Sequence, residues 1–336
     1  MKSRITLFAF LLAGVVVVLG AWTRLSDAGL GCPDWPGCYG FIHVPSSDEH
    51  VALAEERYPD APFEADKAWP EMIHRYFAST LGLVILGLSV AFVRARKETP
   101  RPPLKLPLAL LVLVCLQGAF GAWTVTLKLW PQVVTAHLLG GFATLSLLWL
   151  LYLRQTNGLA GRWFVPGKLY GPGMLVMGLV IVQIALGGWV SSNYAALACP
   201  DFPTCHGMLM PPLDLANGFN VMQSVGPNYL GGQLESDARV TIQVMHRLGA
   251  LIVLMSGGWL AWRLHREGSL FGLALAGVLA VQITLGILNV VLVLPLSIAT
   301  LHNAGGALVL LTLVTVNFRA FRQCHQTGPS ILGHPT

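Results

Sequence analysis

Eight apolar stretches, each long enough to cross a lipid bilayer, constrain this 336-residue sequence more than any other feature. A helix needs about 20 residues to span the hydrocarbon core. The stretches lie near residues 5–22, 72–93, 106–127, 131–153, 171–190, 241–262, 269–292 and 296–318. Because lipid offers the backbone no hydrogen-bond partners, each stretch is expected to be an α-helix. Only 11% of the residues are charged, so the sequence predicts an all-α integral membrane protein.

The basic residues predict which side of the membrane each segment faces. With the N-terminus inside, most of the 21 lysines and arginines fall on inner segments: Lys2, Arg4, Arg94, Arg96, Lys97, Arg101, Lys105, Arg154, Arg162, Lys168, Arg263, Arg266, Arg319 and Arg322. Only Glu98 and Glu267 among the acidic residues lie there. The positive-inside rule therefore places both termini in the cytoplasm and the long loops 23–70 and 191–240 outside. We expect membrane lipid as a partner and no nucleic acid, because the cations do not cluster as a binding face.

The second half of the sequence repeats the first. LGAW at 19–22 matches LGGW at 186–189, IHR at 73–75 matches MHR at 245–247, and TAHLLGG at 135–141 matches TLHNAGG at 300–306. Such repetition indicates two similar units, each with four spans in the same orientation. We predict two tandem four-helix bundles, at 1–153 and 171–322, joined by a cytoplasmic linker at 154–170 and followed by a cytoplasmic tail at 323–336. The first span has a counterpart in the repeat, so we expect it in the mature fold rather than in a cleaved signal peptide.

Two cysteine-bracketed turns, GCPDWPGC at 31–38 and ACPDFPTC at 198–205, lie in the outer loops. Disulfides persist on the outer side of a membrane, and four cysteines allow three pairings. The local pairs Cys32–Cys38 and Cys199–Cys205 are favoured. Unpaired thiols, or a metal site that includes His206, are the alternatives. Cys115, inside the third span, is interpreted as a small core residue.

Four histidines lie within the spans or at their mouths: His74, His137, His246 and His302. The repeat aligns the first with the third and the second with the fourth, so each bundle presents two histidines near the outer ends of its helices. One such histidine often makes an interhelical hydrogen bond, but a duplicated pair at matched depth indicates a functional site. Zinc usually takes three or four ligands, whereas haem iron accepts two axial histidines. We predict a haem slot in each bundle.

The small residues of the two His-x-x-Gly-Gly segments, Gly140–Gly141 and Gly305–Gly306, would give a macrocycle room; plain helix packing is the alternative. Arg75 and Arg247 directly follow two of the histidines and are expected to pair with haem propionates. The alternative is that both arginines anchor their helices at the membrane interface, with the charged groups in water.

A carboxylate distinguishes the two units. Glu71 lies three residues before His74, on the same helix face, and its counterpart before His246 is Gln243. This difference predicts chemistry in the first unit and a tightly held cofactor in the second. A solvated Glu71 in the headgroup region is the alternative.

Together these motifs resemble the haem A synthase family. TRLSDAGLGCPDWPGC (23–38), EMIHR (71–75), TAHLLGG (135–141), ACPDFPTC (198–205), VMHR (244–247) and TLHNAGG (300–306) occur in order around the eight spans. The resemblance implies an oxidoreductase that converts haem O to haem A for terminal oxidases, oxidising one ring methyl to a formyl group by successive hydroxylations. It also implies a resident haem B ligated by His246 and His302, a haem O pocket flanked by His74 and His137, and Glu71 as the catalytic carboxylate.

The resemblance further implies location and partners. The cysteine-bearing motifs are similar to those of bacterial members, which implies the inner (plasma) membrane with the cysteine loops in the periplasm. Haem O is the expected substrate, and haem O synthase (a farnesyltransferase) and cytochrome oxidase assembly factors are the expected partners; a homo-oligomer stays open.

Two rival functions remain at this point. One is a membrane electron-transfer cytochrome that holds two permanent haem B groups, and the other is a transporter or haem-delivery chaperone. The contrast between Glu71 and Gln243 favours an enzyme over the cytochrome. The near absence of charged residues within the spans argues against a transport path.

Overall fold

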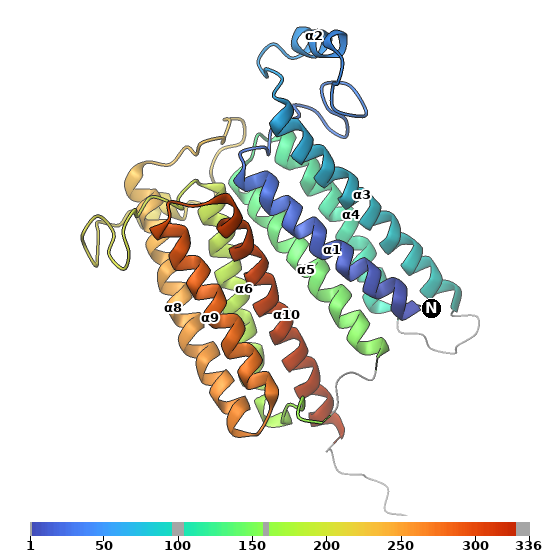
Figure 1. Ribbon diagram of the computed structural model, residues 1–336, viewed down its shortest axis with the longest axis vertical. Helices are drawn as coiled ribbons and strands as arrows, with labels where there is room; N and C mark the ends of the chain where they lie inside the picture. The colour runs from blue at the N-terminus through green and yellow to red at the C-terminus, as the bar shows by residue number, and fades with distance from the viewer. Residues whose placement is uncertain (1, 96–103, 157–160, 327–336) are drawn as a thin grey trace, which may run out of the picture.

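The computed structural model describes residues 2–95, 104–156 and 161–326. Within these ranges, eight helices are long and apolar enough to cross a membrane. They are α1 (Lys2–Leu25), α3 (Ala65–Arg94), α4 (Lys105–Thr126), α5 (Pro131–Gln155), α6 (Tyr170–Ser192), α8 (Ser236–Arg266), α9 (Leu270–Val291) and α10 (Leu296–Gln326) (Figure 1). The predicted all-α, multi-pass membrane fold is confirmed.

Three short helices complete the described chain: α2 (Asp48–Arg57), η2 (Gly167–Leu169) and α7 (Leu215–Gly218). The outer helix α2 begins after Ser47, whose side-chain oxygen accepts a hydrogen bond from the His50 amide at 3.2 Å. A side-chain oxygen at this position satisfies one of the unpaired amides of the first turn.

Three spans are longer than expected from hydropathy. α3 begins at Ala65 and α8 at Ser236, before their apolar stretches, and α10 continues to Gln326. The first residues of the predicted tail, 323–326, are therefore helical, because a helix continues into water after its apolar face has ended. Residues 157–160 of the predicted linker and 327–336 of the predicted tail lie outside the described residues. Three basic residues used to predict the membrane orientation also lie outside them: Arg96, Lys97 and Arg101.

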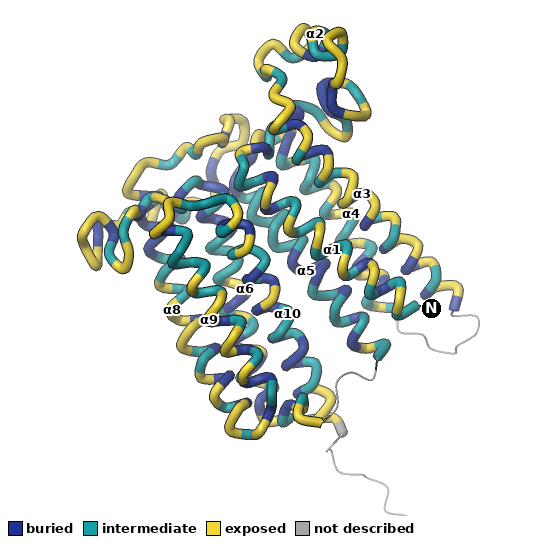
Figure 2. Tube along the Cα trace, in the orientation of Figure 1, coloured by how far each residue is buried: buried dark blue, intermediate teal, exposed yellow. Residues whose placement is uncertain are grey.

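The spans pack in two groups of four. In the first group α1 and α4 each contact both α3 and α5, and in the second α6 and α9 each contact both α8 and α10. The groups meet where α5 contacts α6 and α10, and where α1 contacts α10. Because α10 lies between the two groups, 50% of the residues in its most apolar 18-residue segment are buried (Figure 2). The corresponding share is 11% for α4, which lies at the periphery. The division into two domains with separate roles stays a prediction.

The backbone repeats as the sequence does. Among the described residues, the non-glycine positions with positive φ form four pairs: Asp27 with Tyr194, Tyr39 with His206, Lys128 with Val293, and Leu129 with Leu294. Positive φ is uncommon for residues other than glycine. The two members of each pair are separated by 167 or 165 residues, which are the offsets of the sequence repeat. The two halves therefore turn their chains at corresponding places.

Hydrogen bonds tie the outer ends of the two groups together. Arg24, at the end of α1, donates to the carbonyl of Ser191 at 2.5 Å and to the hydroxyl of Tyr194 at 3.0 Å. Its guanidinium also lies 4.3 Å from the centroid of the Tyr194 ring. Trp130, at the start of α5, donates its indole N–H to the carbonyl of Gln223 at 3.0 Å. The second outer loop thus covers part of the first group.

The spans expose large apolar side chains, for example Leu83 and Leu175, as expected of helices in lipid. Cys115 is also exposed, so its interpretation as a core residue is wrong. Nearly every position of α4 is apolar, and such a helix carries no polar stripe to show which side faces outward.

Candidate active site at the outer ends of the helices

Both predicted disulfides are present. Cys32 and Cys38 are joined by an S–S bond of 2.02 Å, and Cys199 and Cys205 by one of 2.05 Å. Among the described residues, no group of three or more histidine, cysteine or acidic side chains is arranged to hold a metal ion. Because all four cysteines of the turns are in these disulfides, the alternatives of unpaired thiols and of a metal site with His206 are wrong.

An aspartate organises each cysteine turn. In the first turn, the carboxylate of Asp34 accepts hydrogen bonds from the amides of Tyr39 and Gly40 at 2.6 and 2.9 Å. In the second, Asp201 accepts from the amides of His206 and Gly207 at 2.6 and 3.0 Å. The two turns therefore share one hydrogen-bond pattern as well as one sequence pattern.

Protonation in these turns follows from their contacts. The Thr204 hydroxyl and the Gly207 amide, which donate to Asp201, lower the pKa of that carboxyl to about 2. Burial, followed by the nearby carboxylates of Glu64 and Glu71, raises the pKa of the Tyr39 phenol to about 12. Tyr39 is thus neutral at physiological pH and donates its hydroxyl hydrogen to the Pro62 carbonyl at 3.0 Å.

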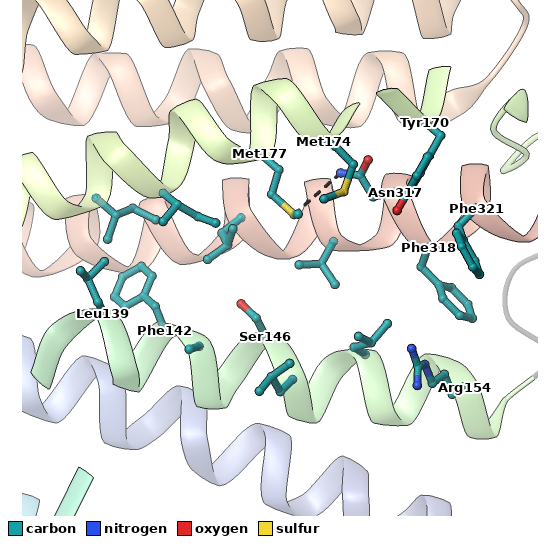
Figure 3. Close-up of a pocket in the computed structure, with 17 residues that line it drawn as sticks. Leu139, Phe142, Ser146, Arg154, Tyr170, Met174, Met177, Asn317, Phe318 and Phe321 are labelled. Atoms are coloured by element: carbon teal, nitrogen blue, oxygen red, sulfur yellow. Dashed lines mark hydrogen bonds between the residues drawn. The ribbon is translucent and has the colours of Figure 1, made fainter. Parts of the chain in front are cut away.

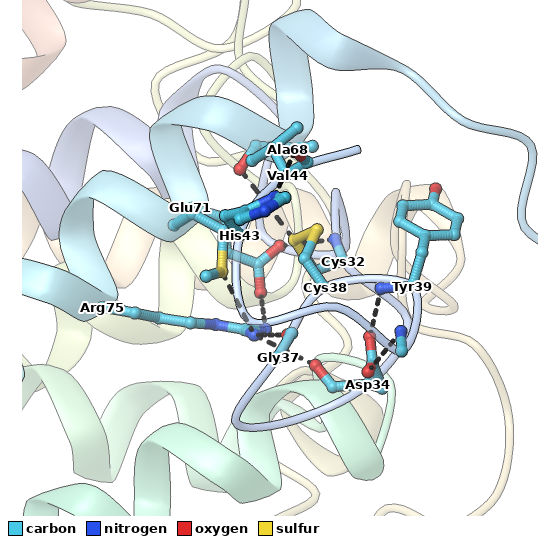
Figure 4. The surroundings of a disulfide bond; sticks show 12 residues. Cys32, Asp34, Gly37, Cys38, Tyr39, His43, Val44, Ala68, Glu71 and Arg75 are labelled. Carbon is cyan, nitrogen blue, oxygen red and sulfur yellow. Dashed lines mark hydrogen bonds and ion pairs between the residues drawn. A yellow bond between two sulfur atoms is a disulfide. The ribbon is translucent and has the colours of Figure 1, made fainter. Parts of the chain in front are cut away.

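The carboxylate of Glu71 lies between the first turn and α3 (Figure 4). It is 5% exposed, so the alternative of a solvated side chain is wrong. One oxygen accepts the Cys32 amide at 2.9 Å, and the other pairs with the Arg75 guanidinium at 2.5 Å. Arg75 also donates to the carbonyls of Asp34 at 3.0 Å and of Gly37. The disulfide-closed turn, the carboxylate and the helix therefore form one connected unit.

The second turn is held by an arginine without a carboxylate. Arg247 donates to the carbonyl of Thr204 at 2.7 Å and to that of Cys199 at 3.0 Å. Gln243, the counterpart of Glu71, is buried, and its side-chain oxygen has no hydrogen-bond partner. Both predicted propionate ligands, Arg75 and Arg247, thus contact backbone carbonyls of a cysteine turn. Their pairing with propionates stays a prediction.

Each of the four histidines faces a glycine on a neighbouring helix. In the first group, a Cβ added at Gly20 of α1 would lie 2.9 Å from the ring of His74, and one at Gly121 of α4 would lie 3.6 Å from the ring of His137. The rings therefore pack on bare backbone. His74 of α3 and His137 of α5 thus lie in the same group of helices, each against a glycine of a neighbouring helix.

The second group repeats this geometry. A Cβ added at Gly187 of α6 would lie 3.3 Å from the ring of His246, and one at Gly286 of α9 would lie 3.0 Å from the ring of His302. His246 of α8 and His302 of α10 again belong to one group of helices. The structure thus places one predicted pair of histidines in each group.

Glutamines contact the second pair of histidines. The Gln183 amide nitrogen lies 3.1 Å from Nδ1 of His246 and donates to the backbone carbonyl of the same residue at 2.9 Å. The Gln282 amide nitrogen lies 3.4 Å from Nε2 of His302. These contacts hold the orientation of both rings.

The first pair has no such contacts in the described structure. The repeat places Val16 where the second half has Gln183, and Nδ1 of both His74 and His137 is buried with no hydrogen-bond partner. Nδ1 of His302 is also without one. A buried nitrogen that lacks a partner carries a desolvation cost, and a bound ligand that reorients the ring can remove it.

The first glycine of each His-x-x-Gly-Gly segment packs against a glutamine side chain. A Cβ at Gly140 would overlap the side chain of Gln117, and one at Gly305 would overlap that of Gln282. The first glycine of each segment therefore makes room for a glutamine of the adjacent helix. Helix packing, the alternative, explains these two positions.

Together these features define a class: an eight-span helical membrane protein with two histidine pairs set beneath disulfide-closed outer turns. Residues 3–314 match the family described as cytochrome oxidase assembly protein. A protein named heme A synthase from Shewanella oneidensis is 48% identical over 97% of both chains. Heme A synthases from Caulobacter sp. strain K31 and Nitrosospira multiformis are 30% and 31% identical, over 96% and 92% of this chain and 97% and 90% of theirs. The chain belongs to this family, and the resemblance to haem A synthases is confirmed.

Sequence reasoning missed the residues that position the histidines. Gly20 and Gly187 lie within the repeated LGAW and LGGW motifs, and Gly121 and Gly286 also align in the repeat. Their recurrence was an available signal, but it does not tell which side chain a glycine will meet. Gln183 had no signal in the repeat, because its counterpart is Val16.

The ion pair of the first turn gives a stability prediction. Arg75→Gln leaves the buried Glu71 carboxylate without its cation, which is expected to cost about 3–5 kcal/mol. Thermal unfolding in detergent, followed by circular dichroism, measures the loss. Addition of Glu71→Gln to this variant removes the buried charge and should recover part of the stability.

Arg247→Gln is the matched control, because that arginine donates to carbonyls and forms no ion pair within 4 Å among the described residues. It should cost less than Arg75→Gln. Equal losses at both positions, with no recovery in the double variant, would contradict this account of the ion pair.

Proposed function

We propose that this protein is a haem A synthase, an oxidoreductase that converts one ring methyl of haem O to a formyl group by two successive two-electron oxidations. Family membership supports this proposal, as does the 48% identity to a protein of that name over nearly the whole chain. Oxidation of an unactivated methyl requires cofactor chemistry, because amino-acid side chains do not supply such an oxidant.

One observation carries the proposal: the two histidine pairs have different surroundings. Beside the first pair lies the buried ion pair of Glu71 and Arg75, and Nδ1 of neither imidazole has a hydrogen-bond partner among the described residues. Beside the second pair lie Gln243 and the glutamines that contact the rings. An ionisable group beside the first pair suits a reacting substrate, whereas histidines whose rings are oriented by glutamine side chains suit a resident cofactor.

In the second half, His246 and His302 would hold the iron of haem B. The residues fit this group, because one imidazole comes from α8 and the other from α10, and each packs on a glycine that leaves room beside the ring. Nδ1 of His302 also has no hydrogen-bond partner among the described residues. Haem bound there would supply one-electron redox chemistry. Arg247 holds the outer turn above the site and is the proposed partner of a propionate.

In the first half, His74 and His137 flank the substrate, haem O. Glu71 is assigned to catalysis: it takes up a proton during the oxidation or stabilises positive charge that develops at the reacting carbon. Arg75 keeps this carboxylate in place through the 2.5 Å ion pair and is the proposed partner of a haem O propionate.

The orientation and partners follow from this function. Both termini are placed in the cytoplasm, and the disulfide-closed turns in the periplasm of a bacterial inner membrane, where disulfides persist. Haem O synthase is the proposed source of the substrate, and cytochrome oxidase assembly factors are the proposed recipients of haem A.

The assignment of Glu71 is tested by Glu71→Gln, which keeps the size of the side chain and removes its charge. The protein is expressed with a source of haem O, and the extracted haems are separated by chromatography. Haem A formation should fall by about 10²-fold or more, the usual contribution of a general acid or base. Haem B of the second half should stay bound.

Glu64→Gln is the matched control, since Glu64 lies just before α3 in an exposed ion pair with Lys67. That variant should form haem A at the wild-type rate. Wild-type yield from Glu71→Gln would refute the catalytic assignment.

The glycines beneath the second histidine pair give a separate test. Gly286→Ala and Gly187→Ala insert a methyl group against the rings of His302 and His246, and such overpacking typically costs about 1–3 kcal/mol. We expect roughly tenfold weaker haem retention, with the larger effect at Gly286, where the gap is smaller. Soret absorbance per chain after detergent washing measures the retained haem.

The controls lie on the same two helices. Gly277 of α9 and Gly178 of α6 have nothing within 4 Å of an added Cβ, so Gly277→Ala and Gly178→Ala should retain haem as the wild type does. If all four variants behave alike, the contact between glycine and imidazole does not position the ligands.

A further inference from the structure

A cavity of about 590 Å³ lies where the two groups of helices meet (Figure 3). α5, α6 and α10 line it, mostly with apolar side chains such as Phe142, Met174 and Phe318. Its volume falls within the roughly 300–1,000 Å³ of typical ligand sites. None of the four histidines and no acidic residue lines it. The cavity is therefore separate from the sites proposed for haem.

The cavity runs along α5 toward the predicted cytoplasmic side. The part of α5 that lines it extends from Leu139 to Arg154, which corresponds to a rise of roughly 22 Å. This length fits within the hydrocarbon core of a bilayer, about 30 Å thick. An occupant would thus be apolar over most of its length.

The cytoplasmic end of the cavity is positively charged. Arg154 lines the cavity there, opposite Phe318 and Phe321 of α10. The guanidinium of Arg322 lies 5.8 Å from the centroid of the Phe318 ring. On this side of the described chain the sole carboxylate, that of Glu267, pairs with Lys168 at 2.6 Å. Among the described residues, no carboxylate balances the positive charge at this end of the cavity, so an anionic group of a bound molecule would be favoured there.

We propose that this cavity binds an anionic phospholipid of the cytoplasmic leaflet, with an acyl chain between the two groups of helices and the phosphate at Arg154 and Arg322. Guanidinium groups bind phosphate oxygens with two parallel hydrogen bonds, and basic pockets between spans on this side of a membrane suit anionic headgroups. The lipid would contact α5 of the first group together with α6 and α10 of the second. It would therefore stabilise the contact between the two halves.

The test uses the full chain in nanodiscs of phosphatidylcholine that contain a minor fraction of phosphatidylglycerol. Native mass spectrometry then measures which lipid stays bound after extraction. The wild type should retain phosphatidylglycerol in preference to phosphatidylcholine. Arg154→Gln/Arg322→Gln should weaken that retention by about 10- to 30-fold, the effect of two surface cations on an anionic lipid.

A second variant tests the cavity rather than the charge. Ala143→Phe places a ring among the lining residues of α5 and should also lower the retention of phosphatidylglycerol, although both arginines remain. The thermal midpoint in pure phosphatidylcholine shows that the variant is folded.

The matched control is Arg263→Gln/Arg266→Gln. These arginines lie on the same side of the membrane and stack on Trp259 and Trp262 of α8, away from the cavity. This variant should retain phosphatidylglycerol as the wild type does. The proposal is overturned if the control loses as much lipid as Arg154→Gln/Arg322→Gln, or if the wild type retains both lipids equally. Displacement of bound phosphatidylglycerol by farnesol would instead assign the cavity to a neutral isoprenoid chain, and would also overturn it.

Discussion

The close approach of four imidazole rings to four glycines is the contact on which the rest of the site depends. In lipid no hydrophobic force draws helices together, so small residues that let backbones approach become the main determinant of packing. Gly20, Gly121, Gly187 and Gly286 each admit a histidine ring from the next helix. The same contacts set the spacing of α1 with α3, α4 with α5, α6 with α8, and α9 with α10. The contacts that position the four histidine rings therefore also position the helices.

The two groups of helices repeat this arrangement of turn, arginine and histidines, but the two copies differ in a few side chains. Both cysteine turns are organised by an aspartate and fastened by an arginine that donates to turn carbonyls. Only the first includes a carboxylate between arginine and turn, and only the second group holds its histidines with glutamine amides. One scaffold thus presents two similar sets of side chains that differ at a few positions, and the proposed division between a reactive site and a cofactor site rests on that difference.

The sequence predicted what repetition and hydropathy encode: the spans, both disulfides and the pairing of the histidines. It did not predict contacts that depend on how helices rotate against each other. The exposure of Cys115 was not predicted, because α4 is so uniformly apolar that its sequence does not show which side is exposed. Gly140 and Gly305 accommodate glutamines because Gln117 and Gln282 reach them across a helix interface. The partners of Arg75 and Arg247 were missed for a similar reason, since a turn distant in sequence folds back onto them.

The most direct test of the central claim is the number and type of haems per chain, measured before and after the purified protein is supplied with haem O. The account predicts one resident haem B that is lost in His246→Ala, and a second equivalent taken up as haem O that is lost in His74→Ala while haem B remains. Two permanent haem B groups in the untreated protein, or a resident haem that survives His246→Ala and His302→Ala, would contradict it.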